Sequence, residues 1–358
     1  MGTVSTDRPL AVLFDVGHPA HVHLFRNAIE ELRRRGHRTF VASREKDVTT
    51  HLLDAYGIAY RSLSRMGDGP VDLVVEWTGR ELRMLSLARS FDPDVLVSVL
   101  SPPAVHVSKL LGRRSVVFTD SEASHLSERI TIPFADVVCT PSGFGRDLGF
   151  HHRRYDGYHE LAYLHPARFE PDPAVLRRHG VSPNSSYAVL RFISWGALHD
   201  VGQSGFSHAA KRRLIDRLER HGEVYITSES PLPPAFEPYR LPVPPEAVHH
   251  LLAYADLYVG DSQTMATEAA LLGTPAVRSN SFAGEDDMSN FRELEEEYGL
   301  LRSVADETGA VQVATELMAD ADAKTRWHRR RNRLLEEKID VTAYIVDVIE
   351  LEGRRHRR

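Results

Sequence analysis

Residues 258–277 (YVGDSQTMATEAALLGTPAV) place a polar turn between a strand-like apolar run and a helix-like segment. Asp261, Ser262 and Thr264 are residue types that cap the amino ends of helices. A helix that begins there directs free backbone N–H groups and a partial positive charge outward, which suits a diphosphate group. Glu268 follows about one turn later, where its carboxylate is placed to accept hydrogen bonds from ribose hydroxyls. The segment therefore predicts a nucleotide site.

Arg191 ends an earlier apolar run and is followed by the loop 194–200 (SWGALHD). A guanidinium is charged at every ordinary pH and can donate two parallel hydrogen bonds to a diphosphate. We expect Arg191 to bind the same ligand, with Trp195, His199 and Asp200 on the loop beside it. His199 and Asp200 are placed to orient each other or the substrate, and a loop that only stabilises itself around Trp195 is an equal alternative.

A second candidate site lies in residues 13–25 (LFDVGHPAHVHLF), where an apolar strand turns into a helix. A neutral imidazole can take a proton from a hydroxyl near neutral pH, so His21 is the predicted general base. His18 and His23 are placed on the acceptor side of the same site. The alternative is that His21 or His23 only caps the helix or packs on the domain interface.

Asp120 and Glu122 follow another apolar run, where they are placed to bind acceptor hydroxyls or to support His21. Carboxylates in such loops are equally often helix caps. The histidine pairs 151–152 and 249–250 are expected on the surface, because adjacent residues in a helix or strand do not share a face.

Apolar runs of strand length recur along the chain and alternate with amphipathic stretches such as 23–35, whose spacing is helical. This alternation predicts parallel sheets with helical crossovers, in which ligands bind outside the carboxyl ends of the strands. The predicted strands are 10–16, 39–42, 95–100, 115–118, 137–139, 187–192, 223–227, 257–259 and 276–277.

The 358 residues suggest two domains. The alternation weakens at the prolines between 153 and 186, which separates a predicted domain at 1–165 from one at 175–335. A helix and basic tail at 338–358 could cross back to the first domain.

A net charge of −6 argues against a general nucleic-acid binder. The lone Cys139 and the lack of a long apolar run predict a cytoplasmic protein, with peripheral contact at the inner face of the membrane left open.

Residues 258–277 resemble the nucleotide-sugar motif of the GT-B superfamily, especially the bacterial lipid II N-acetylglucosaminyl transferases. Ser262, Thr264 and Glu268 occupy the places of the family's polar turn and ribose-binding glutamate, with Gln263 between the first two. Asn290 matches an asparagine that follows the donor loop. The whole chain is similar to the domain-of-unknown-function family 354, whose members are identified as glycosyltransferases by prediction.

The resemblance implies an α/β protein of GT-B architecture, with two Rossmann-like parallel-sheet domains that face a central cleft. The first domain would hold an acceptor, lipid-linked or part of a cell-surface glycan, and the second a nucleotide sugar, with UDP favoured. It also implies transfer without an obligatory metal or cofactor. The oligomeric state is left open.

Three alternatives remain open. A nucleotide-sugar 2-epimerase has a similar Asp-Ser turn, although its His-Arg-x-Glu-Asn segment is missing here. A catalytically silent protein would bind the nucleotide sugar without turnover. The His21-Val-His23 pattern is also similar to that of metal-dependent amidohydrolases, which would require a closed eight-stranded barrel.

Overall fold

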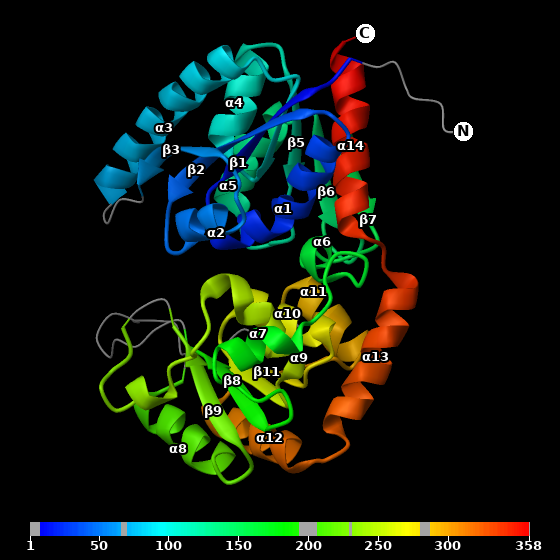
Figure 1. Ribbon diagram of the computed structural model, residues 1–358. Helices are drawn as coiled ribbons and strands as arrows, with labels where there is room; N and C mark the ends of the chain where they lie inside the picture. The colour runs from blue at the N-terminus through cyan, green and yellow to red at the C-terminus, as the bar shows by residue number, and fades with distance from the viewer. Residues whose placement is uncertain (1–7, 66–69, 193–205, 229–230, 280–286, 358) are drawn as a thin grey trace. The chain divides into compact units, whose positions relative to one another are not determined.

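The chain folds into two compact units, each built on one parallel sheet (Figure 1). Unit 1 comprises Met1–Tyr163 and Ile339–Arg358, and unit 2 comprises Leu164–Lys338. The computed structural model describes residues 8–65, 70–192, 206–228, 231–279 and 287–357, with the side chains of 70–75 left out.

Unit 1 contains a seven-stranded sheet in the order β3-β2-β1-β4-β5-β6-β7. All neighbouring strands run parallel. The order reverses direction between β1 and β4, which makes the carboxyl ends of these two strands the topological switch point. The elements of unit 1 are β1 (Ala11–Val16), α1 (Pro19–Arg34), β2 (Arg38–Glu45), α2 (Thr49–Ala55), β3 (Tyr60–Arg65), α3 (Pro70–Phe91), β4 (Val95–Val99), α4 (Pro102–Leu110), β5 (Arg114–Phe118), α5 (His125–Thr131), η1 (Ile132–Phe134), β6 (Val137–Pro141), β7 (His152–Tyr155) and α14 (Val341–His356).

The inner strands of this sheet are buried on both faces. Every residue of β1 (AVLFDV) is buried, which is why a continuous apolar run identified it in the sequence. The edge strands β3 (YRSLSR) and β7 (HRRY) keep exposed polar residues and were not predicted. An edge strand buries only part of its surface, so its sequence lacks the apolar signal.

Helix α1 begins at Pro19, four residues before the predicted start. Proline is favoured in the first turn of a helix, where its missing N–H leaves no partner unsatisfied, and His18 caps the end by accepting from the N–H of Ala20 at 3.2 Å. The helix therefore starts directly at the switch point.

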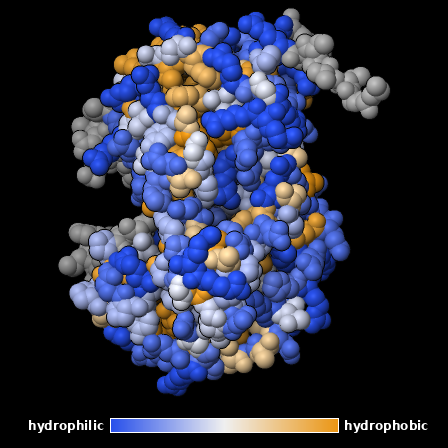
Figure 2. Space-filling model, viewed as in Figure 1, coloured by the Kyte–Doolittle hydropathy of each residue, from blue (hydrophilic) through white to orange (hydrophobic). Residues whose placement is uncertain are grey.

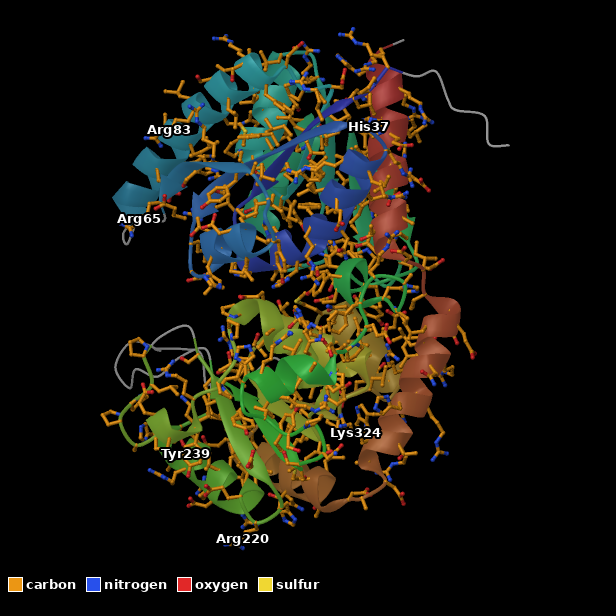
Figure 3. The ribbon with its side chains drawn as sticks, viewed as in Figure 1. His37, Arg65, Arg83, Arg220, Tyr239 and Lys324 are labelled. Carbon is orange, nitrogen blue, oxygen red and sulfur yellow. The ribbon has the colours of Figure 1, made fainter. Side chains whose placement is uncertain are left out.

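The C-terminal helix α14 packs against α1, β4 and β5 within unit 1. Its fully buried Glu352 forms ion pairs with Arg114 and Arg153. His37, labelled in Figure 3, lies 3.2 Å from Glu350 of the same helix. These contacts attach the end of the chain to the first unit.

Unit 2 contains a five-stranded parallel sheet in the order β12-β11-β10-β8-β9. Its direction reverses between β8 and β10, so the switch point lies at the ends of those two strands. The elements of this part of the chain are α6 (Leu161–Leu164, which begins in unit 1), α7 (Pro173–Arg178), β8 (Tyr187–Arg191), α8 (His208–Leu218), β9 (Glu223–Thr227), η2 (Glu237–Tyr239), η3 (Pro245–Ala247), α9 (Val248–Tyr254), β10 (Leu257–Gly260), α10 (Gln263–Leu272), β11 (Ala276–Ser279), α11 (Ser289–Arg292), η4 (Glu293–Glu297), β12 (Leu301–Val304), α12 (Glu307–Ala319) and α13 (Ala323–Glu337).

Two open sheets exclude the closed eight-stranded barrel that the amidohydrolase alternative requires. The prediction of parallel α/β sheets is confirmed. Within the described residues, no helix combines the length and apolarity needed to cross a bilayer. Figure 2 shows a mostly hydrophilic surface with apolar residues gathered over α4, at whose end Leu110 is exposed.

Candidate functional sites

A pocket of about 480 Å³ opens at the switch point of unit 1. This volume falls within the range of small-molecule sites. Leu100, in the turn after β4, has φ of 36°, a left-handed conformation that costs a non-glycine residue about 1–3 kcal/mol. The pocket is lined by residues from β1, α1, β2, α3, the end of β4, the start of α4 and α5: Asp15, Gly17, His21, Arg44, Glu76, Trp77, Arg80, Val99, Leu100, Ser101, Pro102, Pro103 and Ser127.

Asp15 lies at the base of this pocket, near the end of β1, and is almost completely buried. Its carboxylate pairs with Arg80 of α3 and accepts a hydrogen bond from the hydroxyl of Ser101. Arg80 also donates to the carbonyl oxygen of Ser43 and to the hydroxyl of Ser64, each at 3.1 Å. The network joins β1, β2, β3 and α3, and holds a charged pair in a fixed orientation.

A second ion pair lies in the same pocket. Arg44 of β2 donates two hydrogen bonds to Glu76 of α3, at 2.7 and 2.6 Å, and Ser64 donates to Glu76 at 2.8 Å. Sequence reasoning missed these two ion pairs. One signal was available, since a carboxylate such as Asp15 within a buried apolar strand must have a charged or hydrogen-bonding partner.

His21 lines the pocket in the first turn of α1. Its Nδ1 accepts a hydrogen bond from the backbone N–H of Gly17 at 3.3 Å. Burial lowers the pKa of His21 well below its ordinary value of 6.5, and the neighbouring charges of Lys46 and Arg80 act in the same direction. The ring is therefore neutral at physiological pH.

His18 and His23, the other two histidines predicted beside this site, have different surroundings. His18 caps α1, and its ring centroid lies 5.9 Å from that of His21. His23 is buried and packs against Tyr56 and Tyr163, with ring centroids 5.9 and 5.2 Å away. Neither is among the residues that line the pocket.

Asp120 and Glu122 also lie outside the pocket lining. Asp120 pairs with buried His159 at 3.3 Å; burial lowers the pKa of His159, and the Asp120 carboxylate opposes that shift. Glu122 accepts from the backbone N–H of Gly145 at 2.5 Å and thereby holds a loop. The structure thus gives Glu122 a local structural contact.

One histidine of each adjacent pair is buried, which corrects the prediction that both pairs lie at the surface. The side chain of His152 is 4% exposed and its Nε2 lies 2.8 Å from the hydroxyl of Thr140. His249 is 1% exposed. Adjacent side chains do face in different directions. For this reason one histidine of each pair points inward while the other points outward.

In unit 2, Arg191 and Gly260 are opposite each other at the switch point, in the parallel pair of β8 and β10. Arg191 is buried and donates to the hydroxyl of Thr227 at 3.4 Å. A Cβ atom at Gly260 would collide with the carbonyl oxygen of Arg191. The glycine therefore permits the close approach that brings the arginine and the start of α10 to the same edge.

Helix α10 begins directly after this edge. The hydroxyl of Ser262 caps it by accepting from the N–H of Met265 at 3.4 Å, with Asp261 before the cap and Gln263 and Thr264 in the first turn. Gly273 ends the helix in a left-handed conformation with φ of 82°. The predicted strand, turn and helix are thus present in that order.

Glu268 is 3% exposed, and its Oε1 lies 2.9 Å from Nε2 of His249 on α9. A carboxylate held in this way has a fixed orientation one turn inside α10. His249 was not predicted as part of the site, because its spacing from Glu268 in the sequence gives no indication of contact.

Asn290, in the first turn of α11, is 9% exposed, and its Oδ1 has no hydrogen-bond partner among the described residues. A buried amide oxygen without a partner is uncommon. Trp195, His199 and Asp200 lie outside the described residues.

The family model "Protein of unknown function (DUF354)" matches residues 10–341. The chain belongs to this family. The chain is similar in sequence to the uncharacterized protein MJ0665 of Methanocaldococcus jannaschii. The two are 20% identical over 284 residues, covering 75% of this chain and 81% of that protein.

Solved structures extend the similarity of this DUF354 chain to the GT-B fold. Spinosyn forosaminyltransferase SpnP has a TM-score of 0.62 at 14% identity, over 96% of this chain and 100% of its own. A UDP-N-acetylglucosamine 2-epimerase has a TM-score of 0.62 at 16% identity, over 92% of this chain and 95% of its own. MurG of Acinetobacter baumannii has a TM-score of 0.59 at 14% identity, over 96% of this chain and 99% of its own. The chain has the GT-B fold with two parallel-sheet domains, as the sequence predicted.

The lowered pKa of His21 predicts an acid-sensitive fold. Below pH 6.5 the unfolded imidazole binds a proton that the folded one does not, so stability is complete above this pH and falls below it. One such group contributes at most about 1.4 kcal/mol per pH unit. Urea unfolding at pH 7.5 and 5.5 should show a smaller loss for His21→Gln than for the wild type.

Exposed His51 on α2 of the same unit provides the control for this measurement. His51→Gln should leave the loss of stability between the two pH values as it is in the wild type. Equal losses in the wild type and His21→Gln would contradict the assignment of a neutral, buried imidazole to His21.

Proposed function

We propose that the protein transfers a sugar from a nucleoside diphosphate sugar to an acceptor hydroxyl. The observation that carries this proposal is the position of Arg191 at the switch point of unit 2, where its carbonyl oxygen accepts from the N–H of Asp261, next to the Ser262-capped end of α10. A guanidinium and a helix amino end together supply the positive charge and the hydrogen-bond donors that a diphosphate requires. Uracil is the base that we expect.

The remaining donor contacts are assigned by position. Glu268, oriented by His249, is proposed to accept from the ribose hydroxyls, and Gln263, Thr264 and Asn290 to contact the rest of the nucleotide sugar. Within the part of the chain that the structure describes, the buried Oδ1 of Asn290 has no partner, which supports its part, because a ligand would satisfy it.

In the proposed reaction the acceptor oxygen forms a bond to the anomeric carbon of the sugar. The bond from that carbon to the diphosphate oxygen breaks, and its electron pair stays on the diphosphate, where Arg191 and the α10 end stabilise the charge. The proton of the acceptor hydroxyl goes to His21, which is neutral and therefore able to receive it. Unit 1 would hold the acceptor.

The positive groups assigned to the diphosphate are all supplied by the protein, and we propose that no metal is obligatory. Peripheral membrane contact by unit 1 is part of the proposal for a lipid-linked acceptor. Leu82 and Leu110, on α3 and α4, expose 65% and 67% of their surface and support such contact.

A thermal-shift screen tests the donor assignment. Uridine diphosphate at 100 times its Kd should stabilise the protein by about 2.7 kcal/mol, and uridine without phosphates should stabilise it far less. The thymidine, adenosine and guanosine diphosphates complete the screen. No shift with any of the four at millimolar concentration would contradict a nucleoside diphosphate site.

The 2-epimerase is a second candidate, because its TM-score of 0.62 equals that of the forosaminyltransferase. Incubation with the donor sugar alone separates the two activities. Isomerised sugar without acceptor identifies an epimerase, and unchanged donor that reacts only with an acceptor identifies a transferase. Saturable binding without either product would indicate a silent nucleotide-sugar-binding protein.

A further inference from the structure

The pocket of unit 1 combines balanced charge with apolar walls. Its charged lining residues form two closed ion pairs, Asp15 with Arg80 and Arg44 with Glu76. The lining residues that the structure describes therefore carry no net formal charge when His21 is neutral. A charged ligand would meet a carboxylate beside every guanidinium, and a guanidinium beside every carboxylate.

Charges beyond the lining do not alter this balance strongly. Lys46, which acts on His21, lies 3.9 Å from the Asp47 carboxylate. His159, which also acts on His21, pairs with Asp120 at 3.3 Å. Among the described residues, each of these two groups has a carboxylate partner, which offsets its effect on an ionic ligand.

The polar lining groups of the pocket include both hydrogen-bond donors and acceptors. Guanidinium N–H groups donate, carboxylate oxygens accept, and the hydroxyl of Ser101 can do both. His21 adds an N–H when it accepts from Gly17 through Nδ1, because the neutral ring then carries its proton on Nε2. Vicinal hydroxyls donate and accept at adjacent positions, so they can use both kinds of group.

Apolar surface completes the pocket. Val99, Leu100, Pro102 and Pro103 form one wall after β4, and the half-exposed ring of Trp77 lies on α3. Such surfaces suit the C–H faces of a saturated ring, while its hydroxyl edges meet the ion pairs. A sugar has both kinds of surface, whereas a simple anion has no apolar face.

We propose that this pocket receives the acceptor, and that the acceptor presents a neutral polyhydroxyl ring, a sugar or sugar-like unit, to Asp15, Arg44 and Glu76. The identification of the ring as the acceptor rests on the proposed transferase function. The selection of a neutral ring over an anionic one rests on the pocket alone.

The test compares neutral and anionic sugars on the whole protein by saturation-transfer NMR. The neutral probes are the methyl glycosides of glucose, galactose, mannose and N-acetylglucosamine, and the anionic probes are glucuronic acid and glucose 6-phosphate. The wild type should bind at least one neutral probe more tightly than either anion. Trp77→Ala should weaken that binding, because Trp77 lines the pocket and is 38% exposed.

Glu76→Gln supplies the sharper test, because the amide can still accept from Arg44 but no longer cancels its charge. The affinity ratio of anionic to neutral probes should rise by about tenfold. Glu81→Gln is the matched control on the same helix, since Glu81 lies outside the pocket lining and contacts His106 at 2.8 Å. It should leave the ratio unchanged.

Three results would overturn the proposal: preferential binding of an anion by the wild type, no binding of any neutral probe, or an equal change of the ratio in both glutamate variants. Uridine diphosphate affinity is measured on the same samples. If the nucleotide binds and the neutral sugars do not, only the acceptor proposal fails; if the sugars bind and the nucleotide does not, the transferase proposal fails and the neutral sugar site remains.

Discussion

His21→Ala should lower turnover by about 10²–10⁴-fold and leave the affinity for nucleoside diphosphate unchanged. The residue lines the pocket of unit 1, whereas the proposed nucleotide contacts are all in unit 2. Its lowered pKa keeps the imidazole neutral at physiological pH, which a proton acceptor requires. Steady-state turnover and calorimetric titration with uridine diphosphate measure the two quantities.

The tautomer of His21 decides how the ring works. The Gly17 N–H donates to Nδ1 at 3.3 Å, so the neutral ring prefers to carry its proton on Nε2. Accepting a proton on Nε2 requires the other tautomer and the loss of this hydrogen bond, about 0.5–1.5 kcal/mol. A general base contributes about 3–5 kcal/mol, which exceeds that cost.

His21→Gln separates a base from a hydrogen-bond donor. The glutamine amide can donate but cannot take the acceptor proton, so its turnover should be as low as that of His21→Ala. His51→Ala changes an exposed residue of α2, serves as the control and should keep wild-type turnover. If His21→Gln retains most of the activity, His21 acts as a donor, and normal turnover in His21→Ala removes it from the mechanism.

Arg191→Ala should weaken the binding of uridine diphosphate by roughly 10- to 150-fold, because a hydrogen bond to a charged group contributes about 1.5–3 kcal/mol. Arg191 ends β8 opposite Gly260; its guanidinium donates to the hydroxyl of Thr227, and its backbone carbonyl accepts from the N–H of Asp261, just before α10. Calorimetric titration measures the loss. The difference in affinity between the wild type and Arg191→Ala should become smaller with added salt if the interaction is an electrostatic attraction.

Two variants make the Arg191 result specific. Arg191→Lys keeps the charge but loses the paired donors, so its affinity should fall between those of the wild type and Arg191→Ala. Arg240→Ala removes a guanidinium from the surface of the same unit, where it pairs with Glu237, and should bind the nucleotide normally. Unchanged affinity in Arg191→Ala would remove the residue from the donor site.

Much of the fold was predictable because buried parallel strands require continuous apolar sequence. Strands β1, β4 and β8 were predicted within one residue at each end. The edge strands β3, β7 and β12 were missed, since partial exposure permits polar residues there. Order within the sheets also required the structure, because alternation of strands and helices fits several strand orders.

The candidate sites divide in the same manner. The turn and helix from Asp261 to Gly273 are local structure, and their capping residues predict them from the sequence. The contact of Glu268 with His249 joins two different helices. Nothing in the sequence pattern of either residue indicates the other. The prediction placed His249 at the surface because it is adjacent to His250.

By itself, the sequence determined the parallel α/β architecture and the capped turn at Ser262, because strand burial and helix capping depend on residues close together in the chain. Only the tertiary structure decided that Asp15 meets Arg80 and that Arg44 meets Glu76, at separations of 65 and 32 residues. Burying a charge is unfavourable without an opposite charge beside it, and the crossovers of the sheet determine which residues can supply that partner.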